Sequence, residues 1–581
     1  MVQELRQGEE ILLPENPNPN LKDYEEARRT FKWEDVGKEF TWYHTGKVNM
    51  AYEAIDRHAE SWRKNKVAFI YVDREREVKY TFAEMKEHTA RVAAALTSLG
   101  LEKGDRVFIF LPRSPELYIG ILGIIKAGLV AGPLFEAFME AAVKDRLLDS
   151  GARGLITNAE LLPRVPYRDL PDLEHVIVVG AKELPPSDGK TKFYHYEELV
   201  AKAPRDFEPV WLTREDGMII HYSSGTTGKP KGIYHVHNAM IQQYITGKWV
   251  LDLKEEDVYW TTADPGWVTG TSYGIFAPWL NGATNLVRGG RFNPDDWYST
   301  IEKYRVTVWY SAPTAFRMLM GAGEEVVKKY DLSSLRHVLS VGEPLNPEVV
   351  RWGYRVYKQR IHDTWWMTET GAHICVNFAC LPIKPGSMGK PIPGVEIAIL
   401  DDEGNEVPPN TPGNLCIKTP WPSMFRKVWN NEAKYQEYFR FPGWYISGDV
   451  AMKDEDGYYW FLGRADDVIL TSGYRVGPFE IESKLVEHPS VMEAGVIGKP
   501  DPERGEIIKA FVVLREGYQP SEELKKELME FVKKGLSAHA VPREIEFRDK
   551  LPKTRSGKIV RRVLKAWELG LPAGDLSTLE D

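Results

Sequence analysis

The amino-acid sequence predicts a multidomain α/β protein, and three observations lead to this fold class. The 581 residues exceed the roughly 250–300 residues at which a single hydrophobic core stops growing. Short apolar runs with strand character alternate with helical segments from about residue 81 onward, which is typical of mainly parallel sheets covered by helices. The pattern changes near residues 385 and 464, so we expect a smaller β-rich unit and then a C-terminal unit.

The first helix of the α/β region is predicted directly after Thr81. Thr81 is a good N-cap residue, the apolar residues after it recur at helical spacing, and Gly100 ends the pattern. Residues 117–134 are apolar but are interrupted by glycines, Lys126 and Pro133, so they predict a buried helix followed by a strand rather than a membrane span. Further strands are predicted at 105–111, 175–180, 218–224, 306–312 and 337–342.

Composition also suggests the domain boundaries. Residues 1–45 are polar and proline-rich and predict an extended N-terminal arm, and residues 46–463 are assigned to the large domain. Within it, residues 385–463 predict the β-rich subdomain, because short strand-like runs surround tight turns there. Residues 464–581 are assigned to a mixed C-terminal domain with an amphipathic helix from Ser521, and the boundary is placed at 464–467.

Charge and cysteine content exclude several classes of protein. The net charge is −9, whereas a nucleic-acid binder would have a basic footprint. Three cysteines without a C-x-x-C pair argue against a disulfide scaffold or a zinc site and fit a reducing compartment. The first residues lack the pattern of a signal peptide. We therefore expect a cytoplasmic protein whose partners are neither nucleic acids nor membranes.

The most specific local pattern is the segment 222–232, YSSGTTGKPKG. Its glycines let backbone N–H groups converge on an anion, its serines and threonines can donate to phosphate oxygens, and Lys229 and Lys231 supply positive charge. It differs from a Walker A loop because Pro230 follows Lys229. A surface turn is the alternative, but the density of these residues favours a phosphate-binding loop.

This loop resembles the phosphate loop of the adenylate-forming superfamily, which includes acyl-CoA synthetases, luciferases and peptide-synthetase adenylation domains. Three finer matches resemble its AMP-forming acetyl-CoA synthetase (acetate–CoA ligase) branch: GWVTG at 266–270, SVGEPLNPE at 340–348 and DTWW at 363–366. The likeness covers nearly the whole chain after about residue 45. Other superfamily motifs follow in order at 364–371 (TWWMTETG), 445–449 (YISGD), 463–476 (GRADDVI and SGYRV) and 552–558 (PKTRSGK).

The resemblance implies a fold and a reaction. The implied fold is a large N-terminal domain of two α/β subdomains and a small β-rich subdomain, followed by a small mobile α+β C-terminal domain with its hinge at Asp466. ATP and acetate would form an enzyme-bound acetyl-adenylate and diphosphate, and coenzyme A would then accept the acyl group and release AMP. Mg²⁺ is the implied cofactor, because positive charge must offset the repulsion between a carboxylate and the α-phosphate.

The resemblance also assigns roles to individual residues. Lys558 would bridge the carboxylate and α-phosphate oxygens, and Glu369, with Thr226, would hold magnesium. Asp449 would accept hydrogen bonds from both ribose hydroxyls, because a carboxylate has two acceptor oxygens. Each could instead be a solvated or structural side chain. The remaining ATP or AMP contacts are assigned to Ser223, Ser224, Gly225, Thr226, Thr227, Gly228, Lys229, Gly342, Glu343, Pro344, Asp363, Thr364, Trp365, Trp366, Met367, Thr368, Arg464 and Arg475.

The acyl pocket is assigned to Val268, Thr269, Val341 and Trp366. The Trp366 ring would floor the pocket and leave room for two or three carbons. One methylene in a pocket is worth roughly 1–3 kcal/mol, so the preference for acetate over propionate stays open.

Coenzyme A and a second metal site are less clearly marked. The coenzyme A contacts are assigned to Thr269, Asn293, Ser472, Gly473 and Lys533, with Arg164 and Arg168 as the arginines available for the nucleotide. His488, with the carbonyls of Val486 and Val491, matches a second metal site of the superfamily. The superfamily's catalytic lysine is also an acetylation target, so a lysine acetyltransferase and a deacetylase are possible partners at Lys558.

Three alternative functions follow from the same motifs. One is a propionate or other short-chain acyl-CoA synthetase. Another is an adenylation module that loads a carrier protein, although this chain ends 23 residues after Lys558. A luciferase-like oxygenase is a third, but Trp366 would fill the space that a large aromatic substrate requires. A non-catalytic nucleotide-binding module is disfavoured because the charged catalytic positions are all present.

Overall fold

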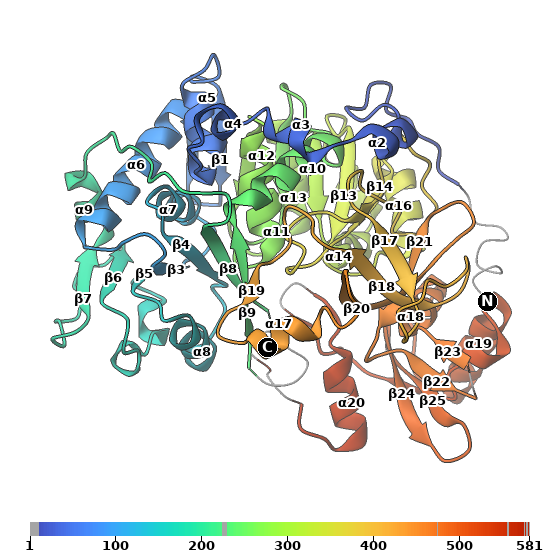
Figure 1. Ribbon diagram of the computed structural model, residues 1–581. Helices are drawn as coiled ribbons and strands as arrows, with labels where there is room; N and C mark the ends of the chain where they lie inside the picture. Colours follow the sequence, from blue (N-terminus) through green and yellow to red (C-terminus); the bar gives the residue numbers. More distant parts are fainter. Residues whose placement is uncertain are drawn as a thin grey trace.

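The computed structural model describes residues 11–223, 229–472, 474–554, 557–573, 576 and 579. A large N-terminal domain carries two helix-flanked sheets, and a smaller C-terminal domain lies below it in the view of Figure 1. A small antiparallel sheet joins the two, so the predicted α/β architecture is confirmed.

One sheet of the large domain contains, within the described residues, nine strands in the order β16-β15-β14-β13-β12-β10-β11-β1-β2. The strands from β14 to β1 run parallel, and antiparallel strands close both edges. The strands are β1 (Val67–Val72), β2 (Glu77–Thr81), β10 (Val258–Thr261), β11 (Thr284–Arg288), β12 (Val308–Ser311), β13 (His337–Val341), β14 (Ile361–Trp365), β15 (Cys375–Val376) and β16 (Lys390–Pro391).

The second sheet has the order β19-β9-β8-β4-β3-β5-β6-β7 in the part of the chain that the structure describes. From β8 to β7 its strands are parallel, and β9 and β19 are antiparallel additions. Its strands are β3 (Arg106–Phe110), β4 (Val130–Leu134), β5 (Gly154–Asn158), β6 (His175–Val179), β7 (Lys192–His195), β8 (Gly217–Ser223), β9 (Lys231–Val236) and β19 (Lys427–Val428).

The last two sheets belong to the end of the chain. An antiparallel sheet of order β17-β18-β20-β21 spans residues 397–464, and the C-terminal domain has a mixed sheet of order β23-β22-β25-β24, with β26 paired to β25. Their strands are β17 (Ile397–Leu400), β18 (Gly413–Lys418), β20 (Trp444–Lys453), β21 (Tyr459–Arg464), β22 (Ile469–Thr471), β23 (Tyr474–Val476), β24 (Val491–Asp501), β25 (Gly505–Leu514) and β26 (Glu544–Phe547).

The helices cover the sheets and begin where local signals predict. Thr81 caps α6 with a complete capping box, since its hydroxyl accepts from Glu84 N and the Glu84 carboxylate accepts from Thr81 N. The longer helices are α6 (Phe82–Ser98), α7 (Pro115–Lys126), α8 (Glu140–Ser150), α10 (Met240–Trp249), α13 (Pro294–Tyr304), α14 (Pro313–Ala322), α16 (Pro347–Tyr357), α18 (Pro478–Glu487), α19 (Glu522–Gly535) and α20 (Arg561–Leu569). The shorter ones are α2 (Tyr24–Thr30), α3 (Trp33–Gly37), α4 (Thr41–Thr45), α5 (Arg57–Ala59), α9 (Tyr196–Lys202), α11 (Val268–Thr271), α12 (Ala277–Leu280), α15 (Glu324–Val327) and α17 (Glu432–Glu437).

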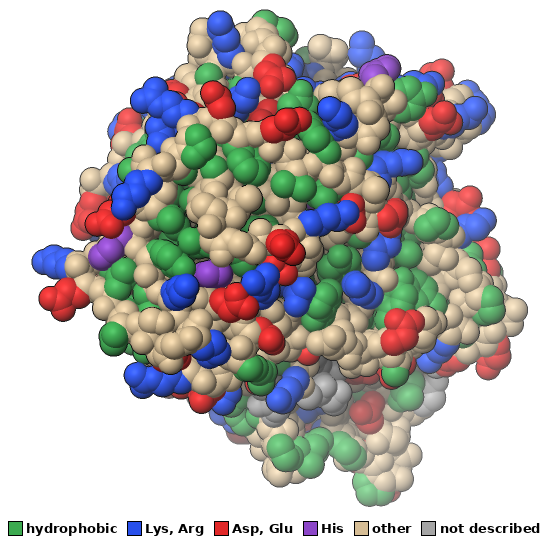
Figure 2. Space-filling view, turned by 60° about the vertical axis from the view of Figure 1, so that its left-hand side comes forward, with side chains coloured by type: hydrophobic (Ala, Val, Ile, Leu, Met, Phe, Trp, Pro, Cys, Tyr) green, Lys and Arg blue, Asp and Glu red, His purple; other side chains and the backbone are tan. Residues whose placement is uncertain are grey.

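The apolar run 117–134 forms the predicted buried helix and strand, α7 and β4. Among the described residues, no helix is both long and apolar enough to cross a membrane. On the face shown in Figure 2, acidic and basic side chains are interspersed, which agrees with the net charge of −9 rather than with a strongly basic surface.

The N-terminal arm differs from the predicted extended segment. It is irregular over residues 11–22, but residues 24–45 form the short helices α2, α3 and α4. Helices of five to seven residues are too short for an apolar period to stand out in the sequence. The arm is nevertheless fixed to the large domain, because Leu12 and Ile383 exchange two backbone hydrogen bonds.

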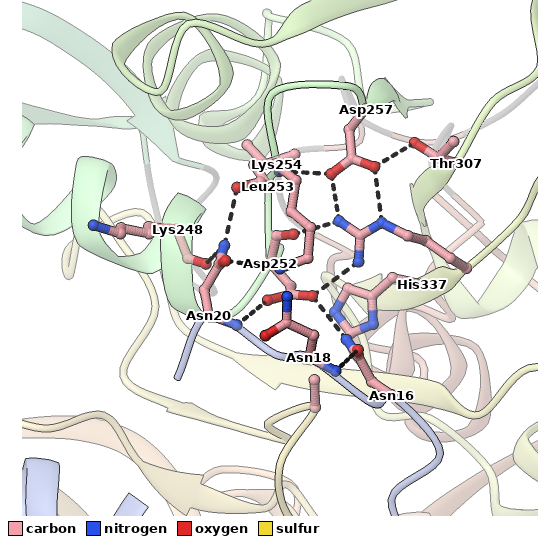
Figure 3. Close-up of polar contacts among 12 residues, drawn as sticks. Asn16, Asn18, Asn20, Lys248, Asp252, Leu253, Lys254, Asp257, Thr307 and His337 are labelled. Carbon is pink, nitrogen blue, oxygen red and sulfur yellow. Dashed lines mark hydrogen bonds and ion pairs between the residues drawn. The ribbon is translucent and has the colours of Figure 1, made fainter. Parts of the chain in front are cut away.

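Asparagines of the arm bind a loop of the large domain (Figure 3). Asn16 Nδ2 and Asn20 N donate to the fully buried Asp252 carboxylate at 2.8 and 2.6 Å. Asn20 Nδ2 also donates to the carbonyls of Lys248 and Leu253, and Asn20 Oδ1 accepts from Lys254 Nζ, each at 2.9 Å. Asn20 therefore connects the arm to the loop that follows α10.

We expect Asn20→Ala to loosen the arm, because the change removes these three side-chain hydrogen bonds. Leaving buried partners unsatisfied costs about 1–3 kcal/mol, so the midpoint of thermal unfolding should fall and limited proteolysis should cut the arm sooner. Asn18→Ala is the matched control, since Asn18 is exposed and its bond to Asn16 Oδ1 uses its backbone N–H. Equal stability of the two variants would contradict this tether.

Candidate functional site

The carboxyl ends of both parallel sheets open into one cleft of about 2250 Å³. Its lining includes Ser223 at the end of β8 and residues that follow β3, β4, β10, β12, β13 and β14. Ligands of open α/β sheets bind outside the carboxyl ends of the strands, so this cleft is the candidate site. The C-terminal domain contributes residues 553–554 and 557–562 to the same lining.

Most of the predicted site residues meet in this cleft. The structure brings together residues from the phosphate loop, three strand ends, the β-rich subdomain and the C-terminal loop. These are Ser223, Val268, Thr269, Val341, Gly342, Glu343, Pro344, Asp363, Thr364, Trp365, Trp366, Met367, Thr368, Glu369, Asp449, Arg464 and Lys558.

The buried carboxylate of Asp449 connects β14 to the β-rich subdomain. Trp365 Nε1 donates to Asp449 Oδ2 at 2.9 Å, and Arg464 NH1 donates to Oδ1 at 2.7 Å. The Asp449 carboxylate raises the pKa of Arg464, because an opposite charge favours the charged form. An aromatic face, a carboxylate and a fixed cation therefore stand side by side in the cleft.

The loops after β13 and β14 are fixed by polar contacts. Gly342 has a φ of +97°, a conformation that favours glycine. The next residue, Glu343, accepts from Thr314 N at 2.5 Å and also from its hydroxyl. Asp363 at the end of β14 is buried, and burial raises its pKa to about 8. At neutral pH Asp363 is therefore a protonated acid and not a negative charge in the cleft.

Glu369 and Lys231 place opposite charges near the phosphate loop. The Glu369 side chain is 7% exposed, and within the described residues no hydrogen bond reaches its carboxylate. Burial lowers the pKa of Lys231, Glu369 opposes that shift, and Lys231 Nζ donates to Tyr438 OH at 2.8 Å. Lys229, which the sequence favoured, is exposed and lies 3.8 Å from Asp145, so Lys231 is the lysine of this motif that lines the cleft.

The predicted residues Ser224, Gly225, Thr226, Thr227, Gly228 and Gly473, and the side chain of Arg475, lie outside the described residues. Two described residues of the same motif line the cleft. Ser223 ends β8 and Lys231 begins β9, and both line the cleft. The buried Ser223 hydroxyl has no hydrogen-bond partner in the described part of the chain, so it is available to a ligand.

Lys558 enters the cleft from the C-terminal domain. Its backbone N–H donates to Thr554 Oγ1 at 3.0 Å, and the loop contacts the large domain where Thr314 Oγ1 lies 2.9 Å from Gly557 O. A Cβ on Gly557 would lie 2.0 Å from Thr314, so this close approach requires glycine. Solvent reaches Lys558 through the cleft, but the surrounding protein and Arg464 lower its pKa.

Val268, Thr269, Val341 and Trp366 all line the cleft, and Val268 packs against a core cluster that contains Val341 and Trp366. Trp366 follows β14 and is 9% exposed, so nearly all of its ring is packed against protein. Val268 and Thr269 lie in α11, which the loop after β10 leads into. These four positions come from three chain segments, and the fold brings them together.

Several other predicted residues lie outside the cleft lining. The Asn293 side chain caps α13 by accepting from Asp296 N at 3.0 Å. Lys533 is exposed on α19, and Ser472, which accepts from Arg504 NH1 at 3.3 Å, also lies elsewhere. Asp466 is exposed in the turn after β21, where its carbonyl accepts from Lys565 Nζ at 3.0 Å.

His488 has hydrogen bonds at both ring nitrogens, to Ser490 Oγ at 2.8 Å and to Glu527 Oε1 at 3.0 Å. The Val491 carbonyl accepts from Arg515 Nε at 3.1 Å, and Val486 is largely buried on α18. In the described ranges, no group of three or more His, Cys, Asp or Glu residues could hold a metal ion. The second metal site at Val486, His488 and Val491 stays a prediction.

The sequence reasoning missed Asp264 and Arg113. Both line the cleft, Asp264 Oδ2 lies 3.7 Å from Arg113 Nε, and neither atom has a hydrogen-bond partner in the described part of the chain. Burial raises the pKa of Asp264 to about 6. Asp264 lies two residues before the GWVTG motif that the sequence analysis recognised. This position next to a site motif is the signal that could have identified Asp264 as a site residue.

Comparisons with known proteins agree with this geometry. Residues 55–429 match the AMP-binding enzyme family, and residues 480–558 match the AMP-binding enzyme C-terminal domain. The chain is 66% identical to an acetyl-coenzyme A synthetase of Bacillus subtilis (strain 168), over 97% of this chain and 98% of that protein. It is 44% identical to an acetyl-coenzyme A synthetase of Methanothrix thermoacetophila, over 93% of this chain and 86% of that protein.

Two solved structures have the same overall fold. An acyl-CoA synthetase of Brucella canis superposes with a TM-score of 0.74 at 36% identity, over 95% of this chain and 99% of that one. An anthranilate CoA ligase in complex with anthranoyl-AMP superposes with a TM-score of 0.83 at 31% identity, over 92% and 99%.

The raised pKa of Asp363 predicts a pH dependence of stability. Between about pH 4 and pH 8 the folded protein holds a proton that the unfolded chain has released, so the free energy of unfolding should fall as pH rises. The slope from one such group approaches ~1.4 kcal/mol per pH unit. Asp363→Asn should remove this part of the slope in urea titrations from pH 5 to pH 8, whereas Asp549→Asn, at an exposed position, should not. A parallel pH dependence of wild type and Asp363→Asn would contradict this assignment.

Proposed function

We infer the function from one premise, that this chain belongs to the AMP-binding enzyme family, as the matches over both of its domains show. It acts as an AMP-forming acetyl-CoA synthetase, a ligase that uses ATP and coenzyme A. The observation that carries this conclusion is the full-length match to acetyl-coenzyme A synthetases, and the residues that line the cleft support our assignment of the reaction steps to particular side chains.

In the first half-reaction a carboxylate oxygen attacks the α-phosphorus and the bond to diphosphate breaks. Two anions approach each other, so fixed positive charge at the reacting oxygens lowers the barrier. Lys558 supplies this charge in our proposal. Its pKa is lowered by the surrounding protein and by Arg464, while Asp449 and Glu343 oppose the shift, so these three groups lie within electrostatic reach of its ammonium group. Lys231 and Arg464 add charge on the neighbouring walls.

Glu369 fits a magnesium ion. Mg²⁺ prefers oxygen ligands and is commonly bound by one or two carboxylates together with substrate phosphates. The Glu369 carboxylate is largely buried, faces the cleft and accepts no hydrogen bond from the described residues, so it is a suitable ligand. The bound ion would neutralise charge that develops on the phosphates. Thr226 stays a predicted second contributor from the phosphate loop.

The nucleotide is proposed to lie along β13, β14 and β20. Asp449 would accept hydrogen bonds from the ribose hydroxyls, with Trp365 Nε1 and Arg464 holding the carboxylate in place. The segments 342–344 and 363–368 line the cleft next to it and would surround the adenine and the phosphates. Both oxygens of Asp449 are thus already oriented before the nucleotide binds.

In the second half-reaction the thiol sulfur of coenzyme A attacks the acyl carbon, the bond to AMP breaks and a proton is released. The structure has Lys558 in the cleft, while Ser472 lies outside its lining, which fits the adenylate-forming arrangement. We place the hinge for the rotation of the C-terminal domain between the two half-reactions at Asp466. Asp466 is exposed in the turn between β21 and β22, and hinges are usually a few residues at the end of an element that absorb the backbone change.

Coenzyme A is proposed to enter between the two sheets. Arg164, one of the two arginines available in the sequence, lines the cleft and donates to Glu136 O at 2.8 Å. Arg168 does not line it. Acetylation of Lys558 would remove the charge that the first step requires, so an acetyltransferase and a deacetylase could regulate that step. A propionate or other short-chain preference is the second candidate, favoured by the modest discrimination that one methylene allows.

Lys558→Ala should abolish adenylate formation but spare thioester formation from supplied acetyl-adenylate. Loss of a charge that acts in one transition state costs roughly 10²–10³-fold in rate, so acetate-dependent diphosphate release should fall by at least that factor. Lys550→Ala removes an exposed lysine from the same basic segment and should leave both rates near wild type. An equal loss in both half-reactions of Lys558→Ala would contradict its assigned role.

Trp366→Gly should shift the preference of the enzyme to longer acids, because it removes the ring that is proposed to floor the acyl pocket. The measurement is diphosphate release with acids from acetate to hexanoate. Each additional methylene that the enlarged pocket can hold should favour the longer acid by about 1–3 kcal/mol. Trp62→Gly is the control, since Trp62 is 72% exposed and does not line the cleft. An unchanged chain-length profile in Trp366→Gly would exclude Trp366 as the floor.

A further inference from the structure

The ring of Trp366 is held from behind by a set of buried aromatic side chains. Tyr273, Tyr310 and Trp366 belong to one hydrophobic core cluster, and Tyr273, Tyr310 and His373 are fully buried. Tyr310 lies on β12, Tyr273 follows α11 and His373 follows the loop after β14. We call Tyr273, Tyr310 and His373 the aromatic frame. Its members come from three different segments of the chain, and none was recognised in the sequence.

Hydrogen bonds connect the frame to the indole. Trp366 Nε1 donates to Tyr310 OH at 3.3 Å, and the same hydroxyl lies 2.5 Å from Thr364 Oγ1 and 2.9 Å from His373 Nε2. Thr364 donates its own proton to Ser340 O at 2.8 Å, so Tyr310 donates to Thr364. His373 must then carry its proton on Nε2 and donate to Tyr310.

This assignment uses the full capacity of the Tyr310 hydroxyl, one donor and two acceptor positions. It also explains why His373 Nδ1 has no hydrogen-bond partner in the described part of the chain, since that atom is then a bare acceptor. A buried hydroxyl without partners would be costly, and one with three partners fixes the directions of all three.

Ring packing fixes the tilt of the indole as well. The Tyr273 ring meets Trp366 edge to face at 5.0 Å and stacks on His373 at 3.8 Å with an interplanar angle of 10°. Tyr273 OH is itself held, because it accepts from His373 N at 2.7 Å and lies 2.8 Å from Thr246 Oγ1. Close-packed interiors transmit such constraints, so the indole has little room to move away from the cleft.

We propose that Tyr310, Tyr273 and His373 are positioning residues that hold the Trp366 ring at one tilt and so set the length of acid that the pocket accepts. The proposal rests on the proposed function of Trp366 as the floor of the acyl pocket. Discrimination between acids that differ by one methylene requires that the side chain closing the pocket keeps its position. A ring that can tilt by rotation about its side-chain bonds would admit another methylene at little cost. The frame removes that freedom.

The test compares ratios of kcat/KM for acetate, propionate and butyrate in diphosphate release. Tyr310→Phe keeps the ring but removes the hydroxyl that holds Trp366 Nε1, and we expect its acetate-to-butyrate ratio to fall about tenfold or more. The KM for butyrate should fall while the KM for acetate rises, a split that a merely destabilised fold would not produce.

Tyr298→Phe is the matched control. Tyr298 OH lies 2.6 Å from Tyr357 OH in a different core cluster, so this variant loses one buried hydrogen bond of the same kind. It should lower the midpoint of thermal unfolding and leave the chain-length ratios unchanged. Comparing the two variants at matched stability separates positioning from general loosening of the core.

Tyr273→Phe supplies a second test and decides the question by itself should Tyr310→Phe not fold. It keeps the edge-to-face contact but loses the bond from His373 N, so its ratio should change in the same direction by a smaller factor. Unchanged ratios in the folded variants would overturn the proposal when Trp366→Gly does shift the profile. If Trp366→Gly leaves the profile unchanged, the pocket floor itself fails, and the role of the frame fails with it.

Discussion

The parallel hydrogen bonding of the two large sheets is the constraint on which the site depends. Parallel strands bring their carboxyl ends to one edge, so the ends of β3, β8, β10, β13 and β14, which lie far apart in the chain, open into the same cleft. The antiparallel sheet of the β-rich subdomain then adds Asp449 to this edge. The C-terminal domain completes the lining, and its Gly557 approaches Thr314 so closely that a side chain there would clash.

The electrostatic character of the cleft follows from its partial burial. The surrounding protein lowers the pKa values of Lys231 and Lys558 and raises those of Asp264 and Asp363, because partial removal from water disfavours every charged form. The consequences for the charge of the cleft differ between the acids and the lysines. At neutral pH Asp363 is neutral, which removes a negative charge from the nucleotide side. A lysine with few partners in such a site gains most when an anionic substrate arrives, since charge interactions are stronger away from bulk water.

Local signals predicted the secondary structure well where an element is long or strongly capped. Thr81 and the apolar run 117–134 became α6, α7 and β4, because capping and uninterrupted apolar periods act over a few residues. The helices α2, α3 and α4 were missed because each is too short to show a period. Asp264 was missed for a different reason, since burial cannot be read from one residue type.

The order of the motifs and the residue types within them determined the family, the two-step chemistry and the residues that could perform it. Only the tertiary structure decided which members of each motif meet. It placed Lys231 rather than Lys229 in the cleft lining, brought Trp365 within 2.9 Å of Asp449, and put the aromatic frame behind Trp366. The physical reason is the separation in sequence over which each effect acts. Propensity and periodicity act between near neighbours in the chain, whereas convergence, burial and shifts in pKa arise from packing between segments that are distant in sequence.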